Sequence, residues 1–99
     1  MVVTLRPIAR LRMLLAEIEG ELGLGNLSTN ERDVLYAAVS EISCPDGSVS
    51  TSDIRGNSIL RDMSDPTMYR TILSLIEKGV LSLAPGRRRG AYVIRNLDL

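Results

Sequence analysis

Residues 63–94 read MSDPTMYRTILSLIEKGVLSLAPGRRRGAYVI, and this stretch decides the fold. Its first half predicts a helix over residues 65–78, with Asp65 as the N-cap and Pro66 at the first helical position. Gly79 ends the helix, because glycine readily adopts the left-handed conformation that follows a last helical turn. The apolar residues of this helix fall on one face, which predicts burial against a core: Met68, Ile72, Leu75 and Ile76.

The second half of the same stretch predicts a hairpin. Residues 80–84 and 91–95 have the composition of short strands, and the loop 85–90 between them has turn residues at both ends. Three consecutive arginines occupy this loop: Arg87, Arg88 and Arg89. A solvated loop and a phosphate contact both explain them, and the elements that flank the loop decide between the two.

Residues 28–43 predict the first helix of the same domain. Ser28 and Glu31 have the spacing of a capping box, in which each side chain accepts a hydrogen bond from the backbone of the other residue. The Pro-Asp-Gly sequence at 45–47 is expected to turn the chain after this helix. The apolar residues form a broad face that is expected to be buried: Val34, Leu35, Ala38, Val39 and Ile42.

A short strand and another helix are expected before the helix at 65–78. The strand is centred on Val49, and Ser50 or Thr51 caps a helix that runs to about residue 62. Only a short turn separates this helix from the next, so the two form a helix-turn-helix candidate. The expected core contacts of the earlier helix are Ile54 and Leu60.

Residues 4–22 predict a separate N-terminal helix, with Thr4 as its N-cap. Its apolar residues are spaced three and four apart, as in a coiled-coil seam: Ile8, Leu11, Leu15, Ile18 and Leu22. A helix this short is only marginally stable by itself in water. Its apolar stripe must therefore be buried either against a dimer partner as well as the domain, or against the domain alone. We therefore divide the chain into a candidate dimerisation element, residues 1–26, and one domain, residues 27–99.

Composition limits the classes of function. The chain has 99 residues, of which 12 are basic and 12 acidic, and 44% are apolar, which suits one globular domain. The absence of histidine excludes a Ser-His-Asp triad, a histidine general base and an HExxH zinc site. The single cysteine, Cys44, excludes an internal disulfide and a cysteine-based metal cage. We therefore expect a cytoplasmic protein with no enzymatic activity, no cofactor, no metal and no membrane span.

Charge is distributed unevenly along this neutral chain. Residues 1–50 contain four basic and seven acidic residues, whereas residues 51–99 contain eight basic and five acidic residues. The positive charge is densest in the hairpin loop. A partner that carries phosphate groups is therefore expected to approach the C-terminal half.

Several short pieces of sequence occur in one order along residues 27–95: LS at 27–28, Glu31, Val34-Leu35, VSTSDI at 49–54, MSDPTMYR at 63–70, LIEKGVL at 75–81 and GRRRGAY at 86–92. Together they resemble the winged helix-turn-helix domain of bacterial transcriptional regulators of the MarR kind. The resemblance implies a mainly α fold with a small antiparallel sheet, in which three helices form the core and the hairpin is the wing. The helix at 4–22 is then an addition to that domain.

The helix at 65–78 is the candidate recognition helix, because the major groove of DNA admits one α-helix. Arg70 can bind a guanine edge or a phosphate, and hydroxyl groups near the helix N-terminus can donate to phosphate oxygens. The alternative for this surface is a solvated polar face. The predicted DNA-binding residues are Ser64, Thr67, Tyr69, Arg70, Ser74, Arg87, Arg88 and Arg89.

The sequence thus predicts a transcriptional regulator that binds double-stranded DNA as a homodimer, with two recognition helices about one DNA turn, roughly 34 Å, apart. Regulators of the MarR kind usually form their dimer with long helices after the wing. This chain is instead expected to dimerise through its N-terminal helix, and no small-molecule effector is assigned. The alternative function is a winged helix that binds a protein and no nucleic acid, which the neutral net charge favours.

Overall fold

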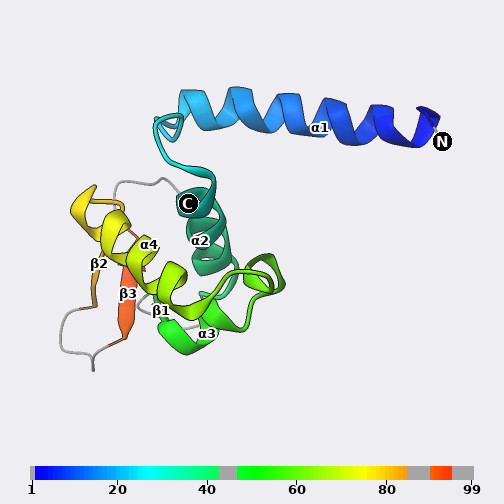
Figure 1. The fold of residues 1–99 in the computed structure, drawn as a ribbon. Coiled ribbons are helices and arrows are strands. Elements are labelled where there is room, and N and C mark those ends of the chain that lie inside the picture. Colours follow the sequence, from blue (N-terminus) through cyan, green and yellow to red (C-terminus); the bar gives the residue numbers. More distant parts are fainter. Residues whose placement is uncertain (1, 43–46, 85–89, 95–99) are drawn as a thin grey trace.

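The computed structural model describes residues 2–42, 47–84 and 90–94, which are mainly helical with one small antiparallel sheet (Figure 1). The elements in chain order are α1 (Val2–Glu21), α2 (Thr29–Ser40), β1 (Ser48–Ser50), α3 (Thr51–Arg55), the 3-10 helix η1 (Ser58–Leu60), α4 (Asp65–Glu77), β2 (Leu81–Leu83) and β3 (Ala91–Ile94). The described part of the chain from residue 24 onward packs together and is called the body below.

Helix α2 is the centre of the body. It begins with the predicted capping box: the Ser28 Oγ accepts from the Glu31 amide at 3.1 Å, and the Glu31 carboxylate accepts from the Ser28 amide at 2.7 Å. The helix ends at Ser40, three residues before the predicted end. Its apolar face contacts α3, η1 and α4, and Val34 and Leu35 are almost completely buried there.

The prediction that the helix after β1 runs to residue 62 is wrong. Helix α3 ends at Arg55, and the chain then forms the separate 3-10 turn η1. Gly56 and Asn57 lie at the break, because glycine disfavours a helix interior and the Asn57 side chain instead caps η1 by accepting from the Ile59 amide. Of the two predicted N-caps, Ser50 caps α3 and Thr51 is its first residue, and the predicted core residues Ile54 and Leu60 are confirmed.

Helix α4 spans nearly the predicted range, but its N-cap lies one residue earlier than expected. Ser64 is the N-cap, since its Oγ accepts from the Thr67 amide, so the prediction of Asp65 as the cap is wrong. Lys78 is the C-cap, and Gly79 has a φ of 79°, the left-handed conformation expected after the helix. The predicted inner face is confirmed: Met68, Ile72 and Leu75 are buried, and Ile76 packs partly against the core.

The three strands form a sheet in the order β1-β3-β2, with both pairs antiparallel. Strand β3 lies in the middle, so the predicted hairpin of β2 and β3 is held to the body by β1. Thr51 reinforces this attachment, because its amide donates to the Gly90 carbonyl at 2.7 Å and its hydroxyl is 3.0 Å from the Tyr92 hydroxyl. The tip of the hairpin, with Arg87, Arg88 and Arg89, lies outside the described residues.

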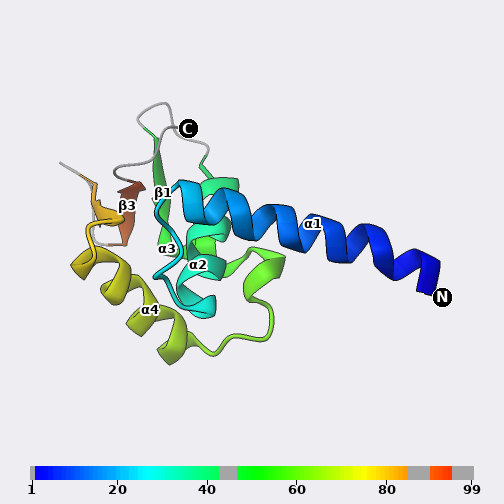
Figure 2. The same ribbon diagram turned by 90° about the horizontal axis from the view of Figure 1, so that it is seen from above.

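Helix α1 extends away from the body, and its N-terminal half contacts none of the labelled elements in either view (Figures 1 and 2). The longest dimension of the molecule is accordingly 50 Å, against 27 and 25 Å for the others. The helix already begins at Val2, so Thr4 is within the helix and the prediction of Thr4 as N-cap is wrong. Within the described ranges, none of the helices combines the length and apolarity that crossing a membrane requires.

Candidate functional site

One side of α4 is left uncovered by the body, and we call it the outer flank. It comprises Pro66, Tyr69, Arg70, Leu73 and Glu77, all of which are exposed. These residues lie opposite the buried Met68, Ile72 and Leu75, as the helical period of 3.6 residues requires. The outer flank is therefore the surface of α4 that a partner can reach without displacing the body.

Arg70 is the cation of the outer flank. Its Nε is 3.4 Å from the Pro66 carbonyl and its Nη2 is 3.5 Å from the Thr67 hydroxyl. Both distances are long for hydrogen bonds, so these contacts orient the guanidinium along the first turns of α4 without consuming its donors. Most of its N–H groups remain available for a planar acceptor such as a phosphate or a guanine edge.

The first turn of α4 uses its hydroxyl groups for capping. The Ser64 Oγ accepts from the Thr67 amide at 3.3 Å and lies 2.9 Å from the Thr67 hydroxyl. Asp65 does not cap the helix, and its carboxylate pairs with the Arg55 guanidinium at 3.2 Å. The negative charge that Asp65 brings to the helix N-terminus is therefore offset by Arg55.

Ser74 lies one helical turn from Arg70, and both residues line a shallow groove between α4 and the start of α2. Ser74 is half-buried there, and its hydroxyl donates to Glu31 at 2.5 Å. The hydroxyl hydrogen is thus already committed within the chain. Thr67 is half-buried at the edge of the same groove, so only Tyr69 and Arg70 of the predicted residues on α4 itself are well exposed.

Glu31 joins α2 to α4 and was predicted only as a cap. The residue is 4% exposed, and its carboxylate accepts from the Ser28 amide, the Ser74 hydroxyl and the Lys78 ammonium, the last at 2.7 Å. Burial by itself raises the pKa of the Glu31 carboxyl, but the hydrogen bonds from Lys78, Ser74 and Ser28 outweigh it and lower the pKa to about 2. Glu31 therefore fixes how α4 lies against α2.

The charges near the outer flank are balanced among the described residues. Arg61 and Arg70 are exposed and basic, whereas Asp62 and Glu77 are exposed and acidic. These four exposed residues therefore carry no net charge.

A second uncovered surface runs along α1. The predicted dimerisation residues are all substantially exposed, from 39% for Leu15 to 65% for Leu11. The body does not cover them, which is contrary to the alternative in which the domain alone buries the stripe: Ile8, Leu11, Leu15, Ile18 and Leu22.

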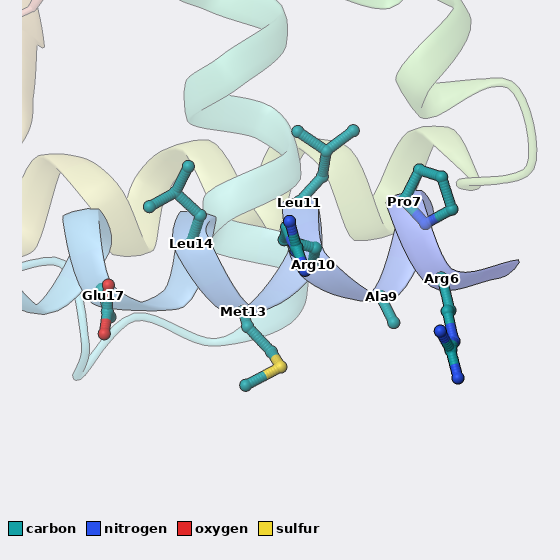
Figure 3. Close-up of a pocket in the computed structure, with 8 residues that line it drawn as sticks. All are labelled: Arg6, Pro7, Ala9, Arg10, Leu11, Met13, Leu14 and Glu17. Atoms are coloured by element: carbon teal, nitrogen blue, oxygen red, sulfur yellow. The ribbon is translucent and has the colours of Figure 1, made fainter.

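A surface hollow along α1 is lined by residues of that helix alone. In Figure 3, Leu11 and Leu14 point to one side of the helix, and Arg6 and Met13 point to the other. The hollow is therefore a feature of a bare helix surface and not an enclosed ligand cavity.

Helix α1 is attached to the body near its C-terminal end through Glu19. This residue is 4% exposed, and its carboxylate accepts from the Tyr36 hydroxyl and lies 3.9 Å from the guanidinium groups of Arg32 and Arg12. Burial, together with the adjacent Glu19 carboxylate, raises the pKa of the Tyr36 hydroxyl to about 12. Sequence patterns had assigned no role to Glu19, because a lone glutamate on a helix is usually solvated.

Comparisons of the chain with protein-family models, curated proteins and solved structures found no match. Among the described residues, no group of three or more carboxylate or cysteine side chains could hold a metal ion. The two uncovered surfaces are therefore the candidate sites within the described part of the chain.

Proposed function

We propose that residues 27–99 form a winged helix that binds double-stranded DNA and acts in transcriptional regulation. Helix α4 enters the major groove, and the hairpin of β2 and β3 is the wing. The order of elements from α2 to β3 is the order that the resemblance to MarR-like regulators implies. The pairing of β3 with β1 supports this proposal further, because it gives the hairpin a fixed direction relative to α4.

The observation that carries the proposal is the outer flank of α4. Tyr69 and Arg70 are exposed within the first two turns of a helix that is directly followed by an arginine-tipped hairpin. The N-terminal part of a recognition helix is where helix-turn-helix proteins contact base edges. Arg70 has free donors for a guanine or a phosphate, and the Tyr69 hydroxyl can donate to a phosphate oxygen.

The other predicted contacts take more limited parts in this proposal. Ser64 and Thr67 position the helix N-terminus, whose positive dipole end favours an anion. Ser74 holds α4 to Glu31 and presents an oxygen that can only accept. Arg87, Arg88 and Arg89 supply the phosphate or minor-groove contacts of the wing.

The test is binding of the full chain to a pool of random duplex DNA, followed by fluorescence anisotropy with a selected sequence at several salt concentrations. We expect R70A to weaken binding by about 1–3 kcal/mol and, if Arg70 holds a phosphate, to reduce the salt slope by about one. The matched control is L73A, one turn away on the same flank, which removes no charge and should leave the salt slope unchanged. Equal binding of R70A and the unaltered chain would refute the role of Arg70.

A protein-binding winged helix is the second candidate, and Leu73 favours it. This side chain is 61% exposed beside Tyr69, and Glu77 follows on the same flank. An apolar residue with a neighbouring acid suits a protein groove better than a DNA backbone. Absence of any selected DNA sequence, together with loss of a bound protein in L73A, would establish this candidate instead.

A further inference from the structure

The shallow groove between α4 and the start of α2 lies beside the outer flank, and we call it the α2–α4 groove. All the residues that line it are polar or charged, and its volume is about 580 Å³. Sites for small molecules are mostly apolar and bury their ligand. An open polar groove therefore suits one part of a large polar partner better than a small molecule.

Arg70 belongs to both surfaces, because it is exposed on the outer flank and also lines the groove. At 3.6 residues per turn, Leu73 lies on the side of Arg70 away from the groove, whereas Ser74 lies on the side toward it. A large partner that lies along the outer flank and binds Arg70 therefore extends over the groove.

Several polar groups of the groove are already hydrogen-bonded within the chain. The Thr71 hydroxyl donates to the Thr67 carbonyl at 2.7 Å, and the Ser74 hydroxyl donates to Glu31 at 2.5 Å. The Glu31 carboxylate is paired with the Lys78 ammonium at 2.7 Å. The negative charge of Glu31 is therefore balanced, and it does not make the groove hostile to an anion.

Two side chains of the groove keep N–H donors for a partner. One is Arg70, whose two contacts within the chain are long, at 3.4 and 3.5 Å. The other is Asn30 of α2, which is exposed and whose side-chain amide forms no hydrogen bond with any described residue. These donors come from the two helices that form the groove, so they suit one group that has several acceptor oxygens.

We propose that a backbone phosphate of the bound DNA lies across the α2–α4 groove, where it accepts hydrogen bonds from Asn30 of α2 and Arg70 of α4. A phosphodiester has unesterified oxygens that can accept from both side chains. The inference rests on the proposed function and deepens it in two respects. It adds Asn30 as a DNA-binding residue, and it places the DNA backbone on the side of α4 that faces α2.

The experiment measures binding of the full chain to the selected duplex by fluorescence anisotropy at several salt concentrations. N30D replaces a donor with an acid, and we expect it to raise the dissociation constant about fivefold or more at about 0.1 M salt. N30K adds a cation at the same place, and we expect it to lower the dissociation constant several-fold and to steepen the salt slope by about one.

A duplex of scrambled sequence tests the kind of contact. Phosphate contacts do not read the base sequence. The N30D and N30K substitutions should therefore change the affinities for the selected and scrambled duplexes by the same factor.

S40K is the matched control, because it adds the same charge to an exposed residue at the other end of α2. Residues 30 and 40 are about 15 Å apart along the helix axis, which exceeds the screening length of about 10 Å at 0.1 M salt. S40K should therefore leave the salt slope unchanged. Urea denaturation checks the fold of N30D, whose midpoint should be unchanged or higher, because an acid is favourable in the first turn of a helix.

Two results would overturn the inference while R70A still weakens binding, and the proposed function would then stand without it. One is a dissociation constant of N30D equal to that of the unaltered chain. The other is an equal steepening of the salt slope in N30K and S40K, which would show a general attraction of DNA to a more basic chain. Absence of any selected DNA sequence would instead refute the proposed function, and the inference with it.

Discussion

Helix α1 and the body differ in whether their apolar residues are covered. Both have apolar residues at helical spacing, yet Leu75 of α4 is completely buried and Leu11 of α1 is 65% exposed. The difference is the neighbourhood: α4 packs against α2 and β2, whereas α1 contacts the body through Glu19, near its C-terminal end. An apolar stripe therefore shows that a helix needs a cover, but it does not show where the cover comes from.

The two regions also treat their acidic residues differently. The Glu31 carboxylate of α2 accepts hydrogen bonds from three donors, and two of them, Ser74 and Lys78, join α2 to α4. Glu17 and Glu21 of α1 are exposed. Stability is thus expected to reside in the body, whereas α1 is expected to serve an intermolecular contact, and the following substitutions test that division.

The largest expected effect on the free energy of unfolding comes from replacing a core leucine with alanine. L75A removes a fully buried side chain and should lower the free energy of unfolding by about 3 kcal/mol. L11A, the matched change in α1, should alter it by less than about 0.5 kcal/mol when the chain is dilute enough to be monomeric. Urea denaturation followed by circular dichroism measures both. Equal losses in the two variants would show that α1 belongs to the cooperative core.

Glu31 provides the next largest effect. E31Q removes the charge that Lys78 pairs with, and should cost about 2 kcal/mol at neutral pH. E17Q on α1 is the control and should leave the free energy of unfolding unchanged.

The pH dependence of the free energy of unfolding also distinguishes Glu31 of the body from Glu17 of α1. The pKa of Glu31 is lowered from 4.5 to about 2 on folding, so its contribution is present above pH 4.5 and is lost as the pH falls toward 2. The slope of unfolding free energy against pH in this window should be shallower in E31Q than in E17Q. Identical slopes would show that Glu31 is not held as a carboxylate by the body.

The smallest expected effect lies at the attachment between the two regions. Y36F removes the hydroxyl that donates to Glu19 and should lower the free energy of unfolding by about 1 kcal/mol. It should also speed amide hydrogen exchange along α1, because the helix loses one of its anchors. Y69F, which alters an exposed tyrosine of the outer flank, should change neither quantity.

The titration of Tyr36 checks the same attachment. Because folding raises the pKa of its hydroxyl from 10 to about 12, its contribution to stability is present below pH 10 and is lost as the pH rises toward 12. Ultraviolet difference absorbance of the unaltered chain should show one tyrosine ionising near pH 12, and Y36F should lack that step.

Local signals predicted most of the elements of this protein correctly. The capping box at Ser28 and Glu31, the cap at Ser50 and the left-handed Gly79 all act through neighbouring residues, so a short stretch of sequence contains the whole interaction. The errors were also local in kind. The sequence alone does not separate Ser64 from Asp65 as the cap of α4, because both residue types cap well and only the backbone geometry distinguishes them.

Residues of the candidate site were harder to predict, because they depend on which neighbour covers each side of a helix. Periodicity correctly assigned Met68 and Ile72 to the core and Arg70 to the exposed side. It could not show that the start of α2 covers the side bearing Ser74. The partners of Glu31 at the other helix, Ser74 and Lys78, are 43 and 47 residues away in the chain, so no local pattern could have revealed them.

The amino-acid sequence by itself determined which segments form helices, the capping box that begins α2 and the two strands of the hairpin. Each of these depends on residues within a few positions of one another, where backbone geometry and side-chain chemistry act directly. Only the tertiary structure decided which side of α4 stays exposed, that Glu31 and Glu19 are buried, and that α1 lies uncovered. Those outcomes depend on contacts between distant parts of the chain, and burial is a property of the assembled body.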